Sequence, residues 1–170
     1  AFDVCAVNRV LNVFAAELGQ EYDRNGDFAR EGVINAWVLE ELDSLEFYEQ
    51  APPKSLGSEW VESTFLPLID YLAPKDALAT AVEHIAQQIV EVLGSRKTLV
   101  SGGGAFNGYL IQRMRMLGAD LHIPDKTLVE AKEAVIFALL AHERIQGRPN
   151  VIGSTTGSGI WHSSGSVFAP

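Results

Sequence analysis

The sequence contains a single cysteine, Cys5, so no disulfide can form within the chain. Basic residues are also few, because 13 Lys and Arg stand against 22 Asp and Glu, for a net charge of −9. Nucleic acids and anionic membranes both bind clustered Lys and Arg, so neither is an expected partner. No apolar run approaches the length that crosses a membrane. These features together predict a cytoplasmic protein.

Patterns that bind metal ions are lacking as well. Asp23, Asn25 and Asp27 alternate as in a calcium loop, but Phe28 stands where that loop needs glycine and Ile34 where it needs a bidentate glutamate. We therefore interpret this segment as a solvated turn. The histidines have no ligand spacing; they stand at positions 84, 122, 142 and 162. No metal site made by the protein is expected.

The two standard nucleotide fingerprints do not occur in residues 97–110, KTLVSGGGAFNGYL. No Lys-Ser or Lys-Thr pair closes a P-loop, and a dinucleotide motif would need glycine at Asn107. The segment does contain Gly102, Gly103 and Gly104, between a β-forming run and residues with helical spacing. Glycines let a ligand approach the backbone closely, and the following helix adds free N–H donors. A nucleotide site of another class and a structural tight turn both fit this pattern.

The organisation of the chain follows from its apolar periodicity. With 170 residues and 47% hydrophobic side chains, one domain over residues 1–170 is expected. Helices are predicted at residues 7–18, 37–45, 61–72, 76–94, 109–117 and 130–145. We expect Asp76 to cap the long helix, and glycines to end three of the helices. Strands are predicted at residues 98–100 and 119–123, with further candidates at 2–4 and 167–168. This alternation predicts an α/β fold weighted to helix.

Four stretches carry a family resemblance: FDVCAVN, APPKSLGSEW, SGGGAFNGYL and KEAVIFALLAHERIQGRPN. In this order and at similar separations they resemble the C-terminal half of anhydro-N-acetylmuramic acid kinases. The resemblance implies one ribonuclease-H-like lobe of an actin-like ATPase fold, helix-rich around a small mixed sheet. It also implies that residues 1–170 are the C-terminal lobe of a longer two-lobe kinase.

The resemblance implies a reaction with ATP and Mg²⁺. Such kinases hydrolyse the 1,6-anhydro bond of the recycled cell-wall sugar and phosphorylate its 6-oxygen. The family's N-terminal phosphate loop does not occur in this sequence, so the chain alone is expected to be inactive without the missing N-terminal lobe. A non-catalytic or chaperone-like ATP-binding lobe is the main alternative. A degenerate lobe that acts only in dimerisation is a further one, and homodimer formation is left open.

The matched motifs also imply residue roles. Asp3 corresponds to the catalytic base that activates water, although a cap for the helix starting near Val7 is the alternative. The glycines 102–104 and Asn107 correspond to the turn at the adenosine, so they are the expected cofactor-binding residues. The expected substrate-binding residues are Asn8, Lys54, Ser55 and Glu133, each with a surface or helix-end role as the alternative. Cys5 is interpreted as a buried structural thiol.

Overall fold

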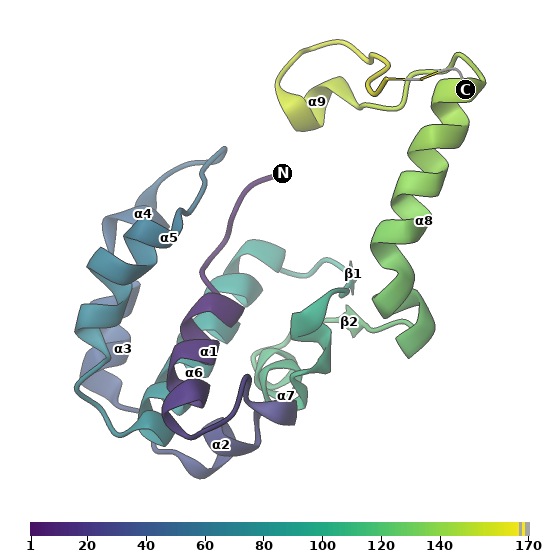
Figure 1. Cartoon of the computed structure of the whole chain (residues 1–170). Coiled ribbons are helices and arrows are strands. Elements are labelled where there is room, and N and C mark those ends of the chain that lie inside the picture. Colours follow the sequence, from purple (N-terminus) through teal and green to yellow (C-terminus); the bar gives the residue numbers. More distant parts are fainter. Residues whose placement is uncertain (167, 169–170) are drawn as a thin grey trace. The chain divides into compact units, whose positions relative to one another are not determined.

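A computed structural model describes residues 1–166 and 168 of the chain (Figure 1). The chain divides into two compact units, Phe2–Pro124 and Asp125–Pro170. The single domain over residues 1–170 stays a prediction. The candidate strand at residues 167–168 includes one position outside the described residues, and residue 168 is not in a strand.

The first unit, Phe2–Pro124, is built mainly from helices. Its regular elements are α1 (Asn8–Glu17), α2 (Asp27–Glu31), α3 (Ala36–Asp43), α4 (Glu46–Glu49), α5 (Ser58–Trp60), α6 (Pro74–Leu93), β1 (Thr98–Leu99), α7 (Gly108–Met116) and β2 (Leu121–His122). Shorter 3-10 or π turns are η1 (Arg24–Gly26), η2 (Val61–Phe65), η3 (Leu66–Leu68) and η4 (Gly103–Phe106). The helix predicted at residues 61–72 is therefore divided into short irregular turns.

The second unit, Asp125–Pro170, contains α8 (Lys126–Ile145) and the short α9 (Gly153–Thr156). The carboxylate of Asp125 caps α8 by accepting a hydrogen bond from the Leu128 amide at 2.9 Å. The helix thus begins four residues before the predicted start. An isolated antiparallel bridge joins Val151 to His162 in the segment that follows.

The sheet of the first unit is small and parallel. β1 pairs with β2, and the amides of Thr98 and Val100 donate to the carbonyl oxygens of Asp120 and His122, each at 2.9 Å. Both predicted strands are confirmed in place, but they form a two-stranded parallel sheet where a mixed sheet was expected. The strand predicted at residues 2–4 is wrong, because this segment pairs with no strand in the described residues. The assignment to an actin-like lobe stays a proposal.

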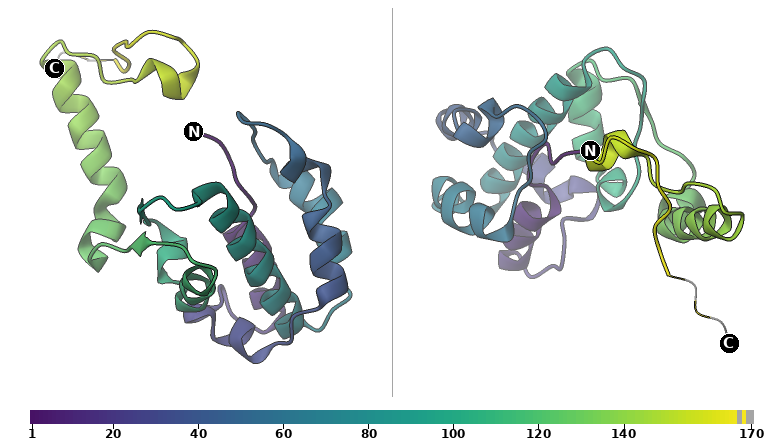
Figure 2. Two further views of the ribbon diagram at one scale, coloured as in Figure 1. Left: turned by 180° about the vertical axis from the view of Figure 1, so that it is seen from behind. Right: turned by 90° about the horizontal axis from the view of Figure 1, so that it is seen from above.

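Helix α6 lies in the middle of the first unit (Figure 2). It packs against α1, α2, α3 and α7, and all residues from 77 to 86 are buried. A helix on the surface of a protein buries only one apolar face. The first half of α6 is instead buried on every side, because neighbours surround it completely.

The polar residues of α6 are buried together with the apolar ones, so each needs a partner. The Thr80 hydroxyl accepts a hydrogen bond from the Asn35 amide at 3.0 Å and donates to the Asp76 carbonyl at 2.8 Å. The His84 ring places Nδ1 2.7 Å from an Asp43 carboxylate oxygen. The contacts with Asn35 and Asp43 connect α6 to the N-cap and to the last residue of α3. The register between these helices is therefore set by polar contacts as well as by packing.

The start of α6 corrects the predicted cap. Ala73 occupies the N-cap position and Pro74 the first helical position, where the missing N–H of proline costs nothing. Asp76 lies in the first turn, and its carboxylate accepts a hydrogen bond from the Val33 amide at 2.7 Å. Asp76 therefore connects the helix to a distant segment. The predicted helix end at Gly94 is confirmed, with φ of 55°.

A buried ion pair joins α6 to α7. The Arg113 guanidinium donates to both carboxylate oxygens of Glu83, at 2.6 and 2.9 Å. The Glu83 side chain is only 7% exposed, whereas the pair of Arg9 and Glu62 on the surface is more than half exposed. The hydrogen bonds that Arg113 donates to Glu83 raise the pKa of Arg113 above its ordinary value. The Arg113 guanidinium therefore stays charged at neutral pH, and its two hydrogen bonds hold α7 against the central helix.

We expect the Arg113→Met variant to lose about 2 to 3 kcal/mol of its free energy of unfolding, because a buried carboxylate loses its charged partner. Only the longer hydrogen bond from Gln87 to Glu83, 3.3 Å, would remain. Urea unfolding followed by circular dichroism measures the change. The control is Arg9→Met, whose exposed pair should contribute less than about 1 kcal/mol. Similar losses in the two variants would contradict the assignment.

Candidate functional site

Asp3 is held by the proline-bounded loop that carries the second motif. Its carboxylate oxygen Oδ2 accepts hydrogen bonds from the Ser55 hydroxyl at 2.9 Å and the Leu56 amide at 2.8 Å. Its own amide donates to the Lys54 carbonyl at 3.0 Å. The fold therefore brings together three of the predicted site residues, from two separate motifs. Leu56 contributes only its backbone, so no side-chain pattern could have indicated it.

The start of α1 tests the helix-cap interpretation of Asp3, whereas the catalytic role stays a prediction. Helix α1 begins at Asn8 after the N-cap residue Val7, and no side chain caps it. The helix-cap alternative is therefore wrong. Two hydrogen bonds lower the pKa of Asp3. The one from the Leu56 amide has the larger effect, and the one from the Ser55 hydroxyl has the smaller effect. Asp3 is exposed and ionised at neutral pH, as a proton acceptor must be.

Lys54 directs its ammonium group to the end of α4. Its Nζ donates to the carbonyl oxygens of Phe47 at 2.8 Å and Tyr48 at 3.3 Å. It also lies 4.4 Å from the centre of the Phe47 ring, which adds a cation–π contact. The ammonium thus holds the loop that positions Asp3. In this structure Lys54 stabilises the loop through its hydrogen bonds to the carbonyl oxygens of Phe47 and Tyr48. Substrate binding by Lys54 stays a prediction.

The glycine turn follows β1 and leads to α7, as the sequence predicted. Gly102 has φ of 86°, a left-handed conformation that favours glycine. Gly103 and Gly104 do not open α7 directly, because they belong to the 3-10 turn η4. A Cβ atom added at Gly103 would lie 3.1 Å from the Asn8 side-chain nitrogen. The predicted substrate residue Asn8 and the predicted nucleotide turn are therefore neighbours.

Asn107 caps α7. Its side-chain oxygen accepts a hydrogen bond from the Leu110 amide at 3.0 Å, and the residue is buried. One of the free N–H donors expected at this helix start is therefore already satisfied. The structural role of Asn107 is plain from this contact, and its role in nucleotide binding stays a prediction.

The segment at residues 23–28 supports the same helix start. The Asp23 carboxylate is buried and accepts hydrogen bonds from the amides of Phe28 at 2.9 Å and Ala29 at 3.0 Å. A Cβ atom at Gly26 would collide with the side chains of Asn107 and Tyr109. The interpretation as a solvated turn is correct only in part. Arg24, Asn25 and Asp27 are exposed, but Asp23 and Gly26 are buried, because the turn packs against the start of α7.

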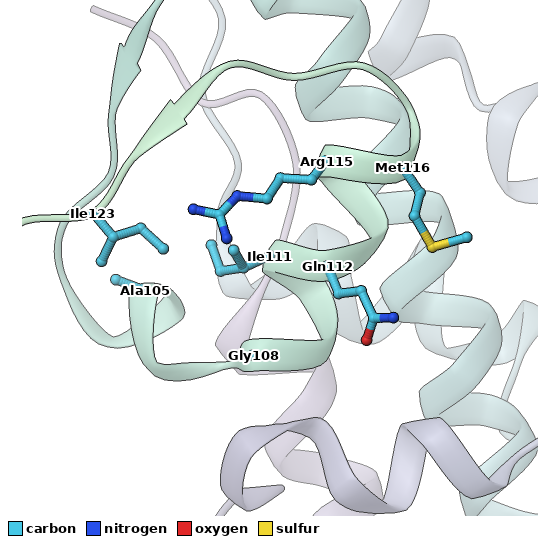
Figure 3. Close-up of a pocket in the computed structure, with 7 residues that line it drawn as sticks. All are labelled: Ala105, Gly108, Ile111, Gln112, Arg115, Met116 and Ile123. Atoms are coloured by element: carbon cyan, nitrogen blue, oxygen red, sulfur yellow. The ribbon is translucent and has the colours of Figure 1, made fainter.

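A shallow pocket of about 510 Å³ lies beside the glycine turn (Figure 3). Its lining consists of Ala105, Gly108, Ile111, Gln112, Arg115, Met116 and Ile123. Arg115 extends from α7 toward Ile123 and donates to the Leu121 carbonyl at 3.4 Å. The pocket combines apolar walls with one cationic side chain. Sequence reasoning did not select Arg115, although it lies on the α7 face that also carries Gly108 and Ile111.

Glu133 lies on α8 in the other unit and is exposed. Its predicted contact with substrate therefore stays a prediction. Within residues 1–166 and 168, no cluster of His, Cys, Asp or Glu could hold a metal ion. None of the helices in the described part of the chain has both the length and the apolar character needed to cross a bilayer.

Comparison with known proteins gives matches along the whole chain. The sequence profile described as anhydro-N-acetylmuramic acid kinase matches residues 1–170. A protein with that name from Ralstonia nicotianae is 31% identical over 98% of this chain and 48% of the relative. Another, from Nitrosospira multiformis, is 36% identical over 92% of this chain and 46% of the relative. A third, from Mannheimia succiniciproducens, is 31% identical over 98% and 50%. The chain spans about half the length of these curated relatives.

Cys5 lies two residues after Asp3 and is only partly exposed. Burial raises the pKa of its thiol to about 12, so the thiol is neutral at neutral pH. We expect it to react with a disulfide reagent at pH 8 roughly a thousandfold more slowly than an unperturbed thiol, because the thiolate is the reactive form. A matched control is Ser63→Cys in a Cys5→Ala background, which places the thiol at an exposed position. Equal reaction rates at the two positions would contradict a buried thiol.

Proposed function

The chain belongs to the anhydro-N-acetylmuramic acid kinase family, and we propose that it forms the C-terminal lobe of a longer ATP-dependent kinase of the actin-like class. The proposed enzyme hydrolyses the 1,6-anhydro bond of anhydro-N-acetylmuramic acid and phosphorylates its 6-oxygen in cytoplasmic recycling of cell-wall sugar. The match over residues 1–170 and the half-length coverage of the relatives support this proposal. The chain alone would then need the rest of the kinase for activity.

The observation that carries the proposal is the ionised Asp3 carboxylate held by Ser55 and Leu56. In the proposed step, the water oxygen bonds to the anomeric carbon while Asp3 takes a proton from that water. The bond between the anomeric carbon and the 6-oxygen breaks, and its electron pair stays on the 6-oxygen. That oxygen then bonds to the γ-phosphorus of the substrate ATP, and ADP leaves. The net reaction consumes one sugar, one water and one ATP.

We assign the sugar to the side of the site that carries Asn8 and Ser55, with Lys54 as a further contact. Substrate binding by Glu133, which lies in the other unit, stays a prediction. The nucleotide is assigned to Gly102, Gly103 and Gly104, with Asn107 beside them. The close approach of Gly103 to Asn8 supports this arrangement, because it connects the two sides at one turn. The pocket at Ala105 and Gly108 gives room for an apolar ring beside the turn.

Mg²⁺ would accompany ATP, where it neutralises phosphate charge. The described residues include no cluster that could hold the ion alone. This arrangement suits magnesium, which is commonly bound by substrate phosphates together with one or two carboxylates.

The chaperone-like alternative is less well supported than the kinase. The family match runs over the whole chain, and an ATP-binding lobe without sugar chemistry has no use for a carboxylate tied to the loop at Lys54 and Ser55. The kinase accounts for both features.

The Asp3→Asn variant of the full-length kinase tests the catalytic assignment. Asparagine keeps the size and an acceptor oxygen but cannot take the proton, so turnover should fall at least about a hundredfold. The thermal midpoint should change little, because Asp3 is exposed and caps no helix. A coupled ADP-release assay and a melting curve give both values. Near-normal turnover in a folded variant would refute the role of Asp3 as base.

The Gly103→Val variant of the same kinase tests the nucleotide assignment. A valine side chain there would crowd Asn8 and the space beside the turn, so ATP affinity should fall about tenfold or more. The control is Ser95→Val, which adds the same side chain in the exposed turn after α6. Isothermal calorimetry measures both affinities. Unchanged affinity in a folded Gly103→Val protein would leave the glycines with a structural role only.

A further inference from the structure

The two hydrogen bonds to the Asp3 carboxylate end on the same oxygen. Oδ2 accepts from the Ser55 hydroxyl and the Leu56 amide, at 2.9 and 2.8 Å. Within the described residues, Oδ1 accepts no hydrogen bond from another side chain or amide. The carboxylate is therefore asymmetric, with one oxygen engaged by the loop and the other available.

We propose that Ser55 is a positioning residue, which holds Asp3 so that Oδ1 is the atom that takes the proton from water. This inference rests on the proposed function, because it assigns an atom within that reaction. It assigns Ser55 a role in addition to its expected contact with substrate.

The hydrogen bonds to Asp3 support this role, because they restrict the rotation of its carboxylate. The terminal torsion of an aspartate is broad, so a free carboxylate rotates and exchanges its two oxygens. The two hydrogen bonds to Oδ2 restrict that rotation. The hydrogen bond from the Asp3 amide to the Lys54 carbonyl also holds the backbone of Asp3 against the loop. A base held in its productive orientation loses less entropy when the reaction occurs. The loop thus prepares the carboxylate before substrate binds.

The hydroxyl of Ser55 has a single proton, and that proton is donated to Asp3. Ser55 can therefore accept a hydrogen bond from a sugar hydroxyl, but it cannot donate one without releasing Asp3. Positioning and sugar contact make different demands on this side chain, so the two roles can be separated by experiment.

The hydrogen bonds from the loop, and not neighbouring charged groups, are the main cause of the lowered pKa of Asp3. The Lys54 ammonium bonds to the carbonyl oxygens of Phe47 and Tyr48 and forms no ion pair with Asp3. The Cys5 thiol is neutral, because burial raises its pKa to about 12. The pKa of Asp3 is lowered by the Leu56 amide first and by the Ser55 hydroxyl second. Removal of the hydroxyl should therefore raise this pKa, while the amide keeps part of the effect.

The first experiment is a carbon-13 NMR titration of the Asp3 carboxyl group in the 170-residue chain. We expect the pKa of Asp3 to rise toward its ordinary value in Ser55→Ala and to stay low in Ser55→Thr, which keeps the hydroxyl. Ser58→Ala, in the first turn of α5, is the matched control and should leave the titration unchanged. An unchanged pKa in Ser55→Ala overturns the positioning role, whether or not the protein is a kinase.

The second experiment measures sugar phosphorylation by the full-length kinase. We expect kcat to fall about tenfold in Ser55→Ala, with KM for the sugar nearly constant and the acidic limb of the kcat profile at higher pH. Ser55→Thr should restore kcat. A raised KM with normal kcat would overturn the inference and make Ser55 a sugar contact alone. No activity in the wild-type protein would refute the proposed function. The titration of Asp3 tests the positioning role independently of that result.

Discussion

The first unit depends on the burial of α6 on every side. An isolated helix of this length would expose its polar residues to water, but residues 77–86 are all buried, so the surrounding helices cover them and supply most of their hydrogen-bond partners. His84 Nε2 is the exception in this stretch, because it is buried without a partner. The Asp43 carboxylate contacts His84 Nδ1, and the Arg113 guanidinium donates a hydrogen bond to Glu83. These contacts fix α3 and α7 relative to the central helix. Because α7 follows the glycine turn, the turn is positioned by the same constraint.

A second constraint positions the candidate catalytic group. Asp3 lies in a segment without regular structure, before α1, and its place is set by the loop that contains Ser55, 52 residues later. The loop is in turn held by Lys54, whose ammonium bonds to carbonyl oxygens at α4. A charged side chain thus stabilises the backbone that orients another charged side chain. Such support is what a preorganised general base requires, because a freely rotating carboxylate would meet water in many unproductive orientations.

Local patterns predicted the elements that depend on local chemistry. Positive φ at Gly19 and Gly94 follows from the freedom of glycine, and the helices ending there were placed correctly. Tertiary contacts overruled the pattern elsewhere. Asp76 does not cap its helix, since its carboxylate bonds to the Val33 amide. Asp23 is buried, since the turn that it begins packs against α7. Acceptor side chains of this kind suit several partners, and the sequence does not say which one is near.

The sequence by itself determined the family, the helical spacing and the residue types available for chemistry, because these follow from the order of side chains along the chain. It left two interpretations of Asp3, a helix cap and a catalytic base. Only the tertiary structure removed the cap, since it places the carboxylate against Ser55 and the Leu56 amide. Backbone donors such as that amide have the same chemistry at every non-proline position. Their pairing therefore depends on how the chain folds in space, and no side-chain pattern encodes it directly.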